Sequence, residues 1–169
     1  MEFLEHLNLQ FNDLIDIRCF EQNVGNFSLG EEIRESSIII KIERLSQLPG
    51  KKCDCIVISF LRDKNKIAIS VIELKSGSYK FSIAKDQIED CIQFLKDNVL
   101  LGENLNYFKK YQWDFFPIIV HKSSSKQNNR AVLSPANRVS LIGEKKPRMV
   151  IFANYHQDLY SKIKNIFRD

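Results

Sequence analysis

The chain has 169 residues, a formal net charge of +4 and 44% hydrophobic residues. This length and composition suit a single domain with its own core, residues 1–169, and no segment reaches the ~20 consecutive apolar residues of a membrane-spanning helix. Residues 1–5 are acidic and do not resemble a secretion signal, so we expect a cytoplasmic protein. The mildly basic charge is compatible with nucleic acid, but many small enzymes share it.

The first 43 residues are expected to form helix, strand, helical turn and strand. Apolar residues at helical spacing over 2–14 predict the first helix. Alternation over 15–20 predicts a strand, and residues 22–30 are rich in turn formers. Ser28 followed by Glu31 matches a capping box, which favours a helical turn to about residue 35. The β-branched segment 37–43 predicts the second strand.

The middle of the chain predicts a β-hairpin followed by a helix. Two apolar runs, residues 55–61 and 67–74, flank a polar turn of about five residues. Ser-Gly-Ser at 76–78 ends the second run. Apolar residues at helical spacing over 83–95 then predict a helix that crosses back over the sheet.

The last third predicts two more strands and a closing helix. Residues 115–121 form an apolar run that ends at His121, which we interpret as a strand-end residue without a catalytic role. Residues 122–130 form a polar, basic loop. Residues 149–153 predict a strand and residues 158–167 an amphipathic helix. The order of elements is that of a mixed α/β domain.

The four cysteines are Cys19, Cys53, Cys55 and Cys91. They lack the closely spaced pairs of a zinc site, and no histidine is near them. On a strand, Cys53 and Cys55 would share the face opposite to Asp54. We therefore expect buried, reduced, structural thiols. A metal cluster is the less favoured alternative, and disulfides are less expected still in a cytoplasmic protein.

Charged residues stand at one end of the predicted hairpin. Asp54 opens the first apolar run, and Glu73-Leu74-Lys75 closes the second. Because side chains alternate along a strand, Glu73 and Lys75 share a face, and antiparallel pairing brings Asp54 to the same end. Two carboxylates suit a hard divalent cation, and a lysine beside them can orient a water or stabilise developing charge. The alternative for each residue is an ordinary surface charge.

This arrangement resembles the PD-(D/E)xK, or restriction-endonuclease-like, nuclease superfamily over about residues 30–121. Cys53 stands where the family name has proline. The resemblance implies an αβββαβ core with a mixed central β-sheet flanked by helices. It also implies Mg²⁺ or Mn²⁺ bound by Asp54, Glu73 and the backbone carbonyl of Leu74, and Lys75 beside the attacking water. The implied activity is hydrolysis of phosphodiester bonds, with DNA favoured over RNA.

Further residues complete this interpretation. Gln87 lies where many members carry a glutamine that orients a water or touches the phosphate; an ordinary surface glutamine is an equal alternative. The family often adds a glutamate on the first helix, for which this sequence offers Glu32, Glu35, Glu2 and Glu5 without deciding between them. A basic rim could bind phosphates, and Trp113 and Tyr111 could stack on bases or, as we favour, pack internally. The rim candidates are Lys80, Lys85, Lys122, Lys126 and Arg130.

Two other functions stay open at this stage. The same fold could bind nucleic acid or a protein partner without cutting, or the acid-x-lysine tripeptide could be a coincidence in an unrelated α/β domain. Members of the nuclease class often act as homodimers or in larger nucleoprotein or defence complexes. Metal binding that depends on Asp54 and Glu73 would separate these alternatives.

Overall fold

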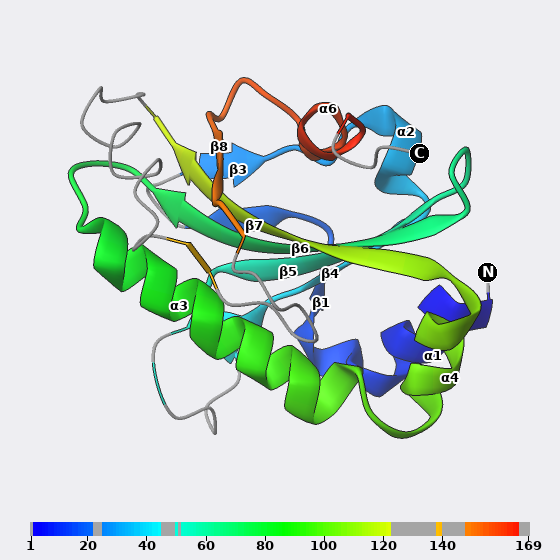
Figure 1. Ribbon diagram of the computed structural model, residues 1–169. Helices are drawn as coiled ribbons and strands as arrows, with labels where there is room; N and C mark the ends of the chain where they lie inside the picture. Colours follow the sequence, from blue (N-terminus) through cyan, green and yellow to red (C-terminus); the bar gives the residue numbers. More distant parts are fainter. Residues whose placement is uncertain are drawn as a thin grey trace.

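The computed structural model describes residues 2–21, 25–44, 50, 52–122, 138–139 and 148–165. Its centre is a mixed six-stranded sheet with helices on both faces (Figure 1), so the expected α/β class is confirmed. The strand order is β1-β4-β5-β6-β7-β8, and a two-stranded sheet, β2-β3, lies apart from it. The strands are β1 Ile15–Asp16, β2 Cys19–Glu21, β3 Gly25–Phe27, β4 Ser37–Ile40, β5 Cys55–Leu61, β6 Lys66–Lys75, β7 Gln112–His121 and β8 Ile151–Ala153.

Strands β4, β5 and β6 form an antiparallel meander, as the two apolar runs predict. In the β5–β6 hairpin Cys55 lies opposite Ile72 and Leu61 opposite Lys66. The connecting turn, residues 62–65, is closed by Asn65 with φ of 52°. Strands β7 and β8 run parallel to β6. A parallel neighbour requires a crossover connection, which α3 Phe81–Phe94 begins, as expected.

The remaining helices are short. They are α1 Glu2–Gln10, α2 Glu31–Arg34, α4 Gly102–Lys110 and α6 Leu159–Ile163, with 3-10 turns at Asn12–Leu14 and Ile42–Arg44 and a π turn at Leu95–Val99. None of the described helices has the length and apolar character needed to cross a bilayer. Helix α4 was not predicted, because its segment contains glycine and two asparagines, which are weak helix formers.

Several local predictions need correction. Gly30, with φ of 89°, is the N-cap of α2, whereas Ser28 forms a bridge with Asp158; the capping-box prediction is therefore wrong. Strand β4 ends at Ile40, and the expected strand over 15–20 is divided between β1 and β2. Residues 123–130 of the predicted basic loop lie outside the described part of the chain.

The core forms one layer on each face of the sheet. Helix α3 packs on one face against Ile67, Ile69 and Val71, whereas α6 packs on the other against Ile72 and Leu74. Burial of such side chains contributes about 1.5–3 kcal/mol each. Because β6 is apolar on both faces, it is a rigid central strand whose end is fixed in position.

The cysteines form two disulfides, Cys19–Cys55 and Cys53–Cys91. Their burial is as expected, but the prediction of reduced thiols is wrong. The expected shared face is also wrong. Cys53 packs with the α3-side core and Cys55 with the opposite core, because the chain bends at Asp54 before β5 begins. The two disulfides therefore flank Asp54 and hold it from both sides of the sheet.

Candidate active site

Asp54 and Glu73 both lie at the open end of the β5–β6 hairpin. The Asp54 N–H donates to the Ile72 carbonyl at 3.2 Å, and Asp54 Oδ2 accepts a hydrogen bond from the Leu74 N–H at 2.5 Å. The regular hairpin register ends at Cys55 and Ile72, and these two bonds hold Asp54 at the end of β6 beyond it. Glu73 follows Ile69 and Val71 on the face of β6 that α3 covers, whereas the Asp54 carboxylate reaches the Leu74 N–H at the edge between the two strands.

Lys75 neutralises the buried carboxylate of Glu73. Glu73 is 1% exposed, and Lys75 Nζ forms an ion pair with its Oε1, while 21% of the Lys75 side chain remains exposed. A carboxylate taken out of water is costly unless a cation or hydrogen-bond donors compensate. The ion pair supplies that compensation and fixes the ammonium group beside the carboxylates.

Gln87 joins this pair from α3. Its Oε1 accepts a hydrogen bond from Lys75 Nζ at 3.2 Å, and its Nε2 donates to the Lys52 carbonyl at 2.8 Å. Cys91 lies one turn further along α3 and is bonded to Cys53. Helix α3 is thus attached twice to the segment that carries Asp54. The structure brings Asp54, Glu73, Lys75 and Gln87 together.

The oxygen donors at this end fit a hard divalent cation. In a strand the N–H and C=O of one residue point to the same side, and the Leu74 N–H points to Asp54. The Leu74 carbonyl therefore faces the Asp54 side as well. Two carboxylates and one backbone carbonyl match the preference of Mg²⁺ for oxygen ligands, with waters completing its shell.

A third carboxylate does not join the pair. Among the described residues no group of three or more acidic, histidine or cysteine side chains could hold a metal ion. Glu2 and Glu5 are on α1, which packs against α4. Glu32 is on α2, which packs against β5, and Glu35 is the C-cap of that helix. Figure 1 shows α1 and α4 at the end of the sheet where β7 starts, away from the ends of β6 and β7. All of these glutamates are exposed.

His121 and Tyr79 extend the polar edge next to Lys75. His121 lies opposite Lys75 in the parallel β6–β7 pair, and its Nε2 is 2.8 Å from the Gly77 carbonyl oxygen. The Tyr79 and His121 ring centroids are 5.4 Å apart. Burial raises the pKa of the Tyr79 hydroxyl to about 12, which keeps it neutral. Tyr79 was not predicted from the sequence, in which its only signal is its position four residues after Lys75.

The aromatic candidates lie elsewhere. Trp113 packs edge-on against Phe108 and Phe115, and Tyr111 packs against Phe60. Both aromatic candidates are near the start of β7, at the opposite end from Glu73, and the favoured expectation of internal packing is confirmed.

The basic rim is only partly described. Lys85 pairs with Glu89 at 3.7 Å, and Lys80 and Lys122 are exposed. Lys126 and Arg130 lie outside the described residues. The phosphate-binding rim stays a prediction.

Comparison of the chain with protein-family models, with curated proteins and with solved structures found no match.

Proposed function

We propose that this chain is a metal-dependent nuclease with a restriction-endonuclease-like core, hydrolysing phosphodiester bonds of nucleic acid, with DNA favoured over RNA. The observation that carries the proposal is the meeting of Asp54, Glu73, Lys75 and Gln87 at one end of the β5–β6 hairpin. The order of the antiparallel meander, α3 and the parallel β7 supports it, because the αβββαβ core requires this connectivity.

Each residue has a distinct role in this proposal. Asp54, Glu73 and the Leu74 carbonyl would hold Mg²⁺ or Mn²⁺. When bound, such an ion polarises a phosphate oxygen and lowers the pKa of a bound water. Lys75 positions the attacking water and offsets charge on the phosphate as it develops. Gln87 orients the ammonium group of Lys75. In-line attack on phosphorus expels the 3′ oxygen and leaves a 5′-phosphate and a 3′-hydroxyl.

The burial of charged residues at this end of the hairpin favours a functional role for them over a purely structural one. Asp54 is 8% and Glu73 1% exposed, at the end of strands that are otherwise apolar. Hydrophobic residues of similar volume often stabilise a fold at least as well as a buried ion pair. Buried charged groups that face one another are therefore enriched at functional sites.

Lys75→Ala tests the proposal directly. With Mg²⁺ present, the wild-type chain should cut at least one of plasmid, single-stranded DNA and RNA. We expect Lys75→Ala to cut at least ~10²-fold more slowly, since a charge-stabilising group is lost. Lys66→Ala, at the other end of the same strand, should cut at the wild-type rate. Cleavage by Lys75→Ala at the wild-type rate would contradict the proposal. So would the lack of metal-dependent cleavage of all three substrates by the wild type.

A non-catalytic binding module is the second candidate. The lack of a third carboxylate near Glu73 among the described residues favours it. Such a module would bind nucleic acid or a protein partner equally well with and without Mg²⁺. It would not cleave the nucleic acid that it binds. Homodimerisation and a cytoplasmic location also belong to the nuclease proposal; the two disulfides are the observation against that location.

A further inference from the structure

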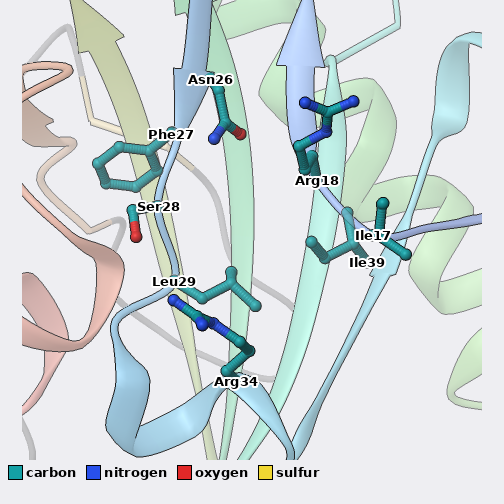
Figure 2. Close-up of a pocket in the computed structure, with 8 residues that line it drawn as sticks. All are labelled: Ile17, Arg18, Asn26, Phe27, Ser28, Leu29, Arg34 and Ile39. Atoms are coloured by element: carbon teal, nitrogen blue, oxygen red, sulfur yellow. The ribbon is translucent and has the colours of Figure 1, made fainter.

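A pocket lies on the face of the sheet opposite to α3. Its volume is about 230 Å³, and Figure 2 shows the eight side chains that line it. They come from the segment after β1, from β3 and the residues after it, from α2 and from β4. Phe27 and Ile39 in its lining belong to the core layer away from α3. The pocket is therefore separate from the Asp54–Glu73 site, where Glu73, Lys75 and Gln87 lie on the α3 face.

The pocket is positively charged. Arg18 and Arg34 line it, and none of the other described lining residues is charged. Within the described structure neither guanidinium forms an ion pair with a carboxylate. The Arg18 guanidinium lies 5.8 Å from the centroid of the Phe20 ring. Because arginine stays protonated in proteins, the positive charge is present at every physiological pH.

The two arginines stand on different sides of the pocket. In Figure 2 Arg34 rises from α2 with its guanidinium toward Leu29, while Arg18 stands at the level of Asn26 across the opening. The cation–π contact with Phe20 limits the freedom of Arg18. Positive charge therefore stands on two sides of the pocket, with the Arg18 guanidinium turned toward Phe20.

The rest of the lining is apolar with two neutral polar groups. Phe27 and Ile39 are 1% and 3% exposed and belong to the core beside the pocket, whereas Ile17 is 84% exposed. Asn26 and Ser28 offer an amide and a hydroxyl. Sites for drug-sized ligands usually measure about 300–1,000 Å³. This smaller pocket suits a small molecule with one acidic group and a short apolar body.

We propose that this pocket binds a small organic phosphate, a phosphomonoester carrying an apolar or aromatic group. A phosphomonoester has a charge of about −2 at neutral pH and three acceptor oxygens, which matches two arginines. Guanidinium groups form strong, charge-assisted hydrogen bonds with phosphate oxygens. The apolar body packs on Ile17 and Leu29, the lining residues with exposed apolar surface. The chain therefore has a ligand site that is independent of its candidate active site.

Titration of phenyl phosphate into the full chain tests this proposal, read by calorimetry without divalent cations. We expect binding with a Kd of about 1 mM or lower, weaker binding of inorganic phosphate, and weaker binding of benzyl alcohol. Arg18→Gln and Arg34→Gln should each weaken phenyl phosphate binding at least fivefold. Both arginines are exposed, so these variants should fold, and circular dichroism checks that they do.

Two control variants define the outcome. Arg62→Gln removes an exposed arginine in the β5–β6 turn, and Glu73→Gln alters the candidate active site; both should bind phenyl phosphate as the wild type does. No binding by the wild type, or unchanged binding by Arg18→Gln and Arg34→Gln, would overturn the proposal. Inorganic phosphate or benzyl alcohol binding as tightly as phenyl phosphate would also overturn it.

Discussion

The two ends of the β5–β6 hairpin carry charged residues that look alike in the sequence but differ in the structure. At the turn, Arg62 and Asp63 are exposed. At the open end, Asp54 and Glu73 are buried, and α3 covers them with Gln87. A charged residue at the end of an apolar run therefore points to a functional site when another element of the fold covers that residue. Buried charges need a compensating partner close by, whereas the exposed charges of the turn are also solvated by water.

Replacing the Glu73–Lys75 ion pair by apolar residues should give the largest difference between the effects on cleavage and on stability. In Glu73→Leu/Lys75→Met we expect cleavage to be lost, because a metal ligand and the charge-stabilising lysine are both gone. The free energy of unfolding should stay unchanged or rise by about 1–4 kcal/mol, since buried ion pairs are costly to desolvate. Urea denaturation and a cleavage assay measure the two effects.

The turn end provides the control for that double variant. Lys66→Met changes a half-buried charge at the start of the same strand. It should alter stability by no more than about 0.5 kcal/mol and leave cleavage intact. If Glu73→Leu/Lys75→Met still cleaves nucleic acid, or loses several kcal/mol of unfolding free energy, the ion pair at the open end does not have the proposed catalytic role.

The two disulfides allow the α3 side of the sheet to be compared with the opposite side. Cys53→Ser/Cys91→Ser should lose about 2–4 kcal/mol of stability and also some cleavage activity, because α3 and Gln87 are then held less firmly. Cys19→Ser/Cys55→Ser should lose a similar stability but keep more activity, since Cys19 lies on the face away from α3. Equal losses of activity would contradict this view, and alkylation of four free thiols in the native protein would exclude the disulfides.

Gln87 tests whether α3 contributes to the site beyond packing. Gln87→Leu removes hydrogen bonds to Lys75 and to the Lys52 carbonyl. We expect a loss of about 1 kcal/mol in stability and about a tenfold slower cleavage. Gln93→Leu, on an exposed position of the same helix, should leave cleavage unchanged. If both variants cut equally well, Gln87 is an ordinary helix-surface residue.

Tyr79 gives the smallest expected effect. Its folded-state pKa of about 12 exceeds the ordinary value of 10.0. Its stabilising contribution is therefore complete below pH 10 and lost as the pH rises from 10 to 12, where the unfolded chain ionises first. Compared with Tyr79→Phe, the wild type should lose stability in this window, on the order of 1 kcal/mol after allowance for solvent exposure. If the free energies of unfolding of the two proteins change with pH in the same way, burial does not shift the pKa of Tyr79.

The hairpin, α3 and the grouping of Asp54 with Glu73 and Lys75 could be predicted because strand alternation and helical spacing are local signals. Even Gln87 could be placed, since it lies two turns into the helix that follows the tripeptide. What holds it, the Lys52 carbonyl, could not be predicted, because a backbone partner leaves no mark in the sequence.

Features that depend on contacts distant in the sequence were missed or mispredicted. The capping box failed because Gly30, with its positive φ, is the N-cap of α2, two residues after Ser28. The disulfides join residues 36 and 38 positions apart. Arg18 and Arg34 have no motif in common, and only the folding of β3 and α2 over β4 brings them to one pocket.

Calorimetric titration of Mn²⁺ tests the central claim most directly. The wild type should bind Mn²⁺, and Asp54→Ala/Glu73→Ala should not, while Glu32→Ala/Glu35→Ala, which removes two exposed carboxylates from α2, should bind as the wild type does. Circular dichroism confirms that each variant is folded. Equal binding by wild type and Asp54→Ala/Glu73→Ala, or no binding by the wild type with nucleic acid present, would contradict a metal-dependent active site at the open end of the hairpin.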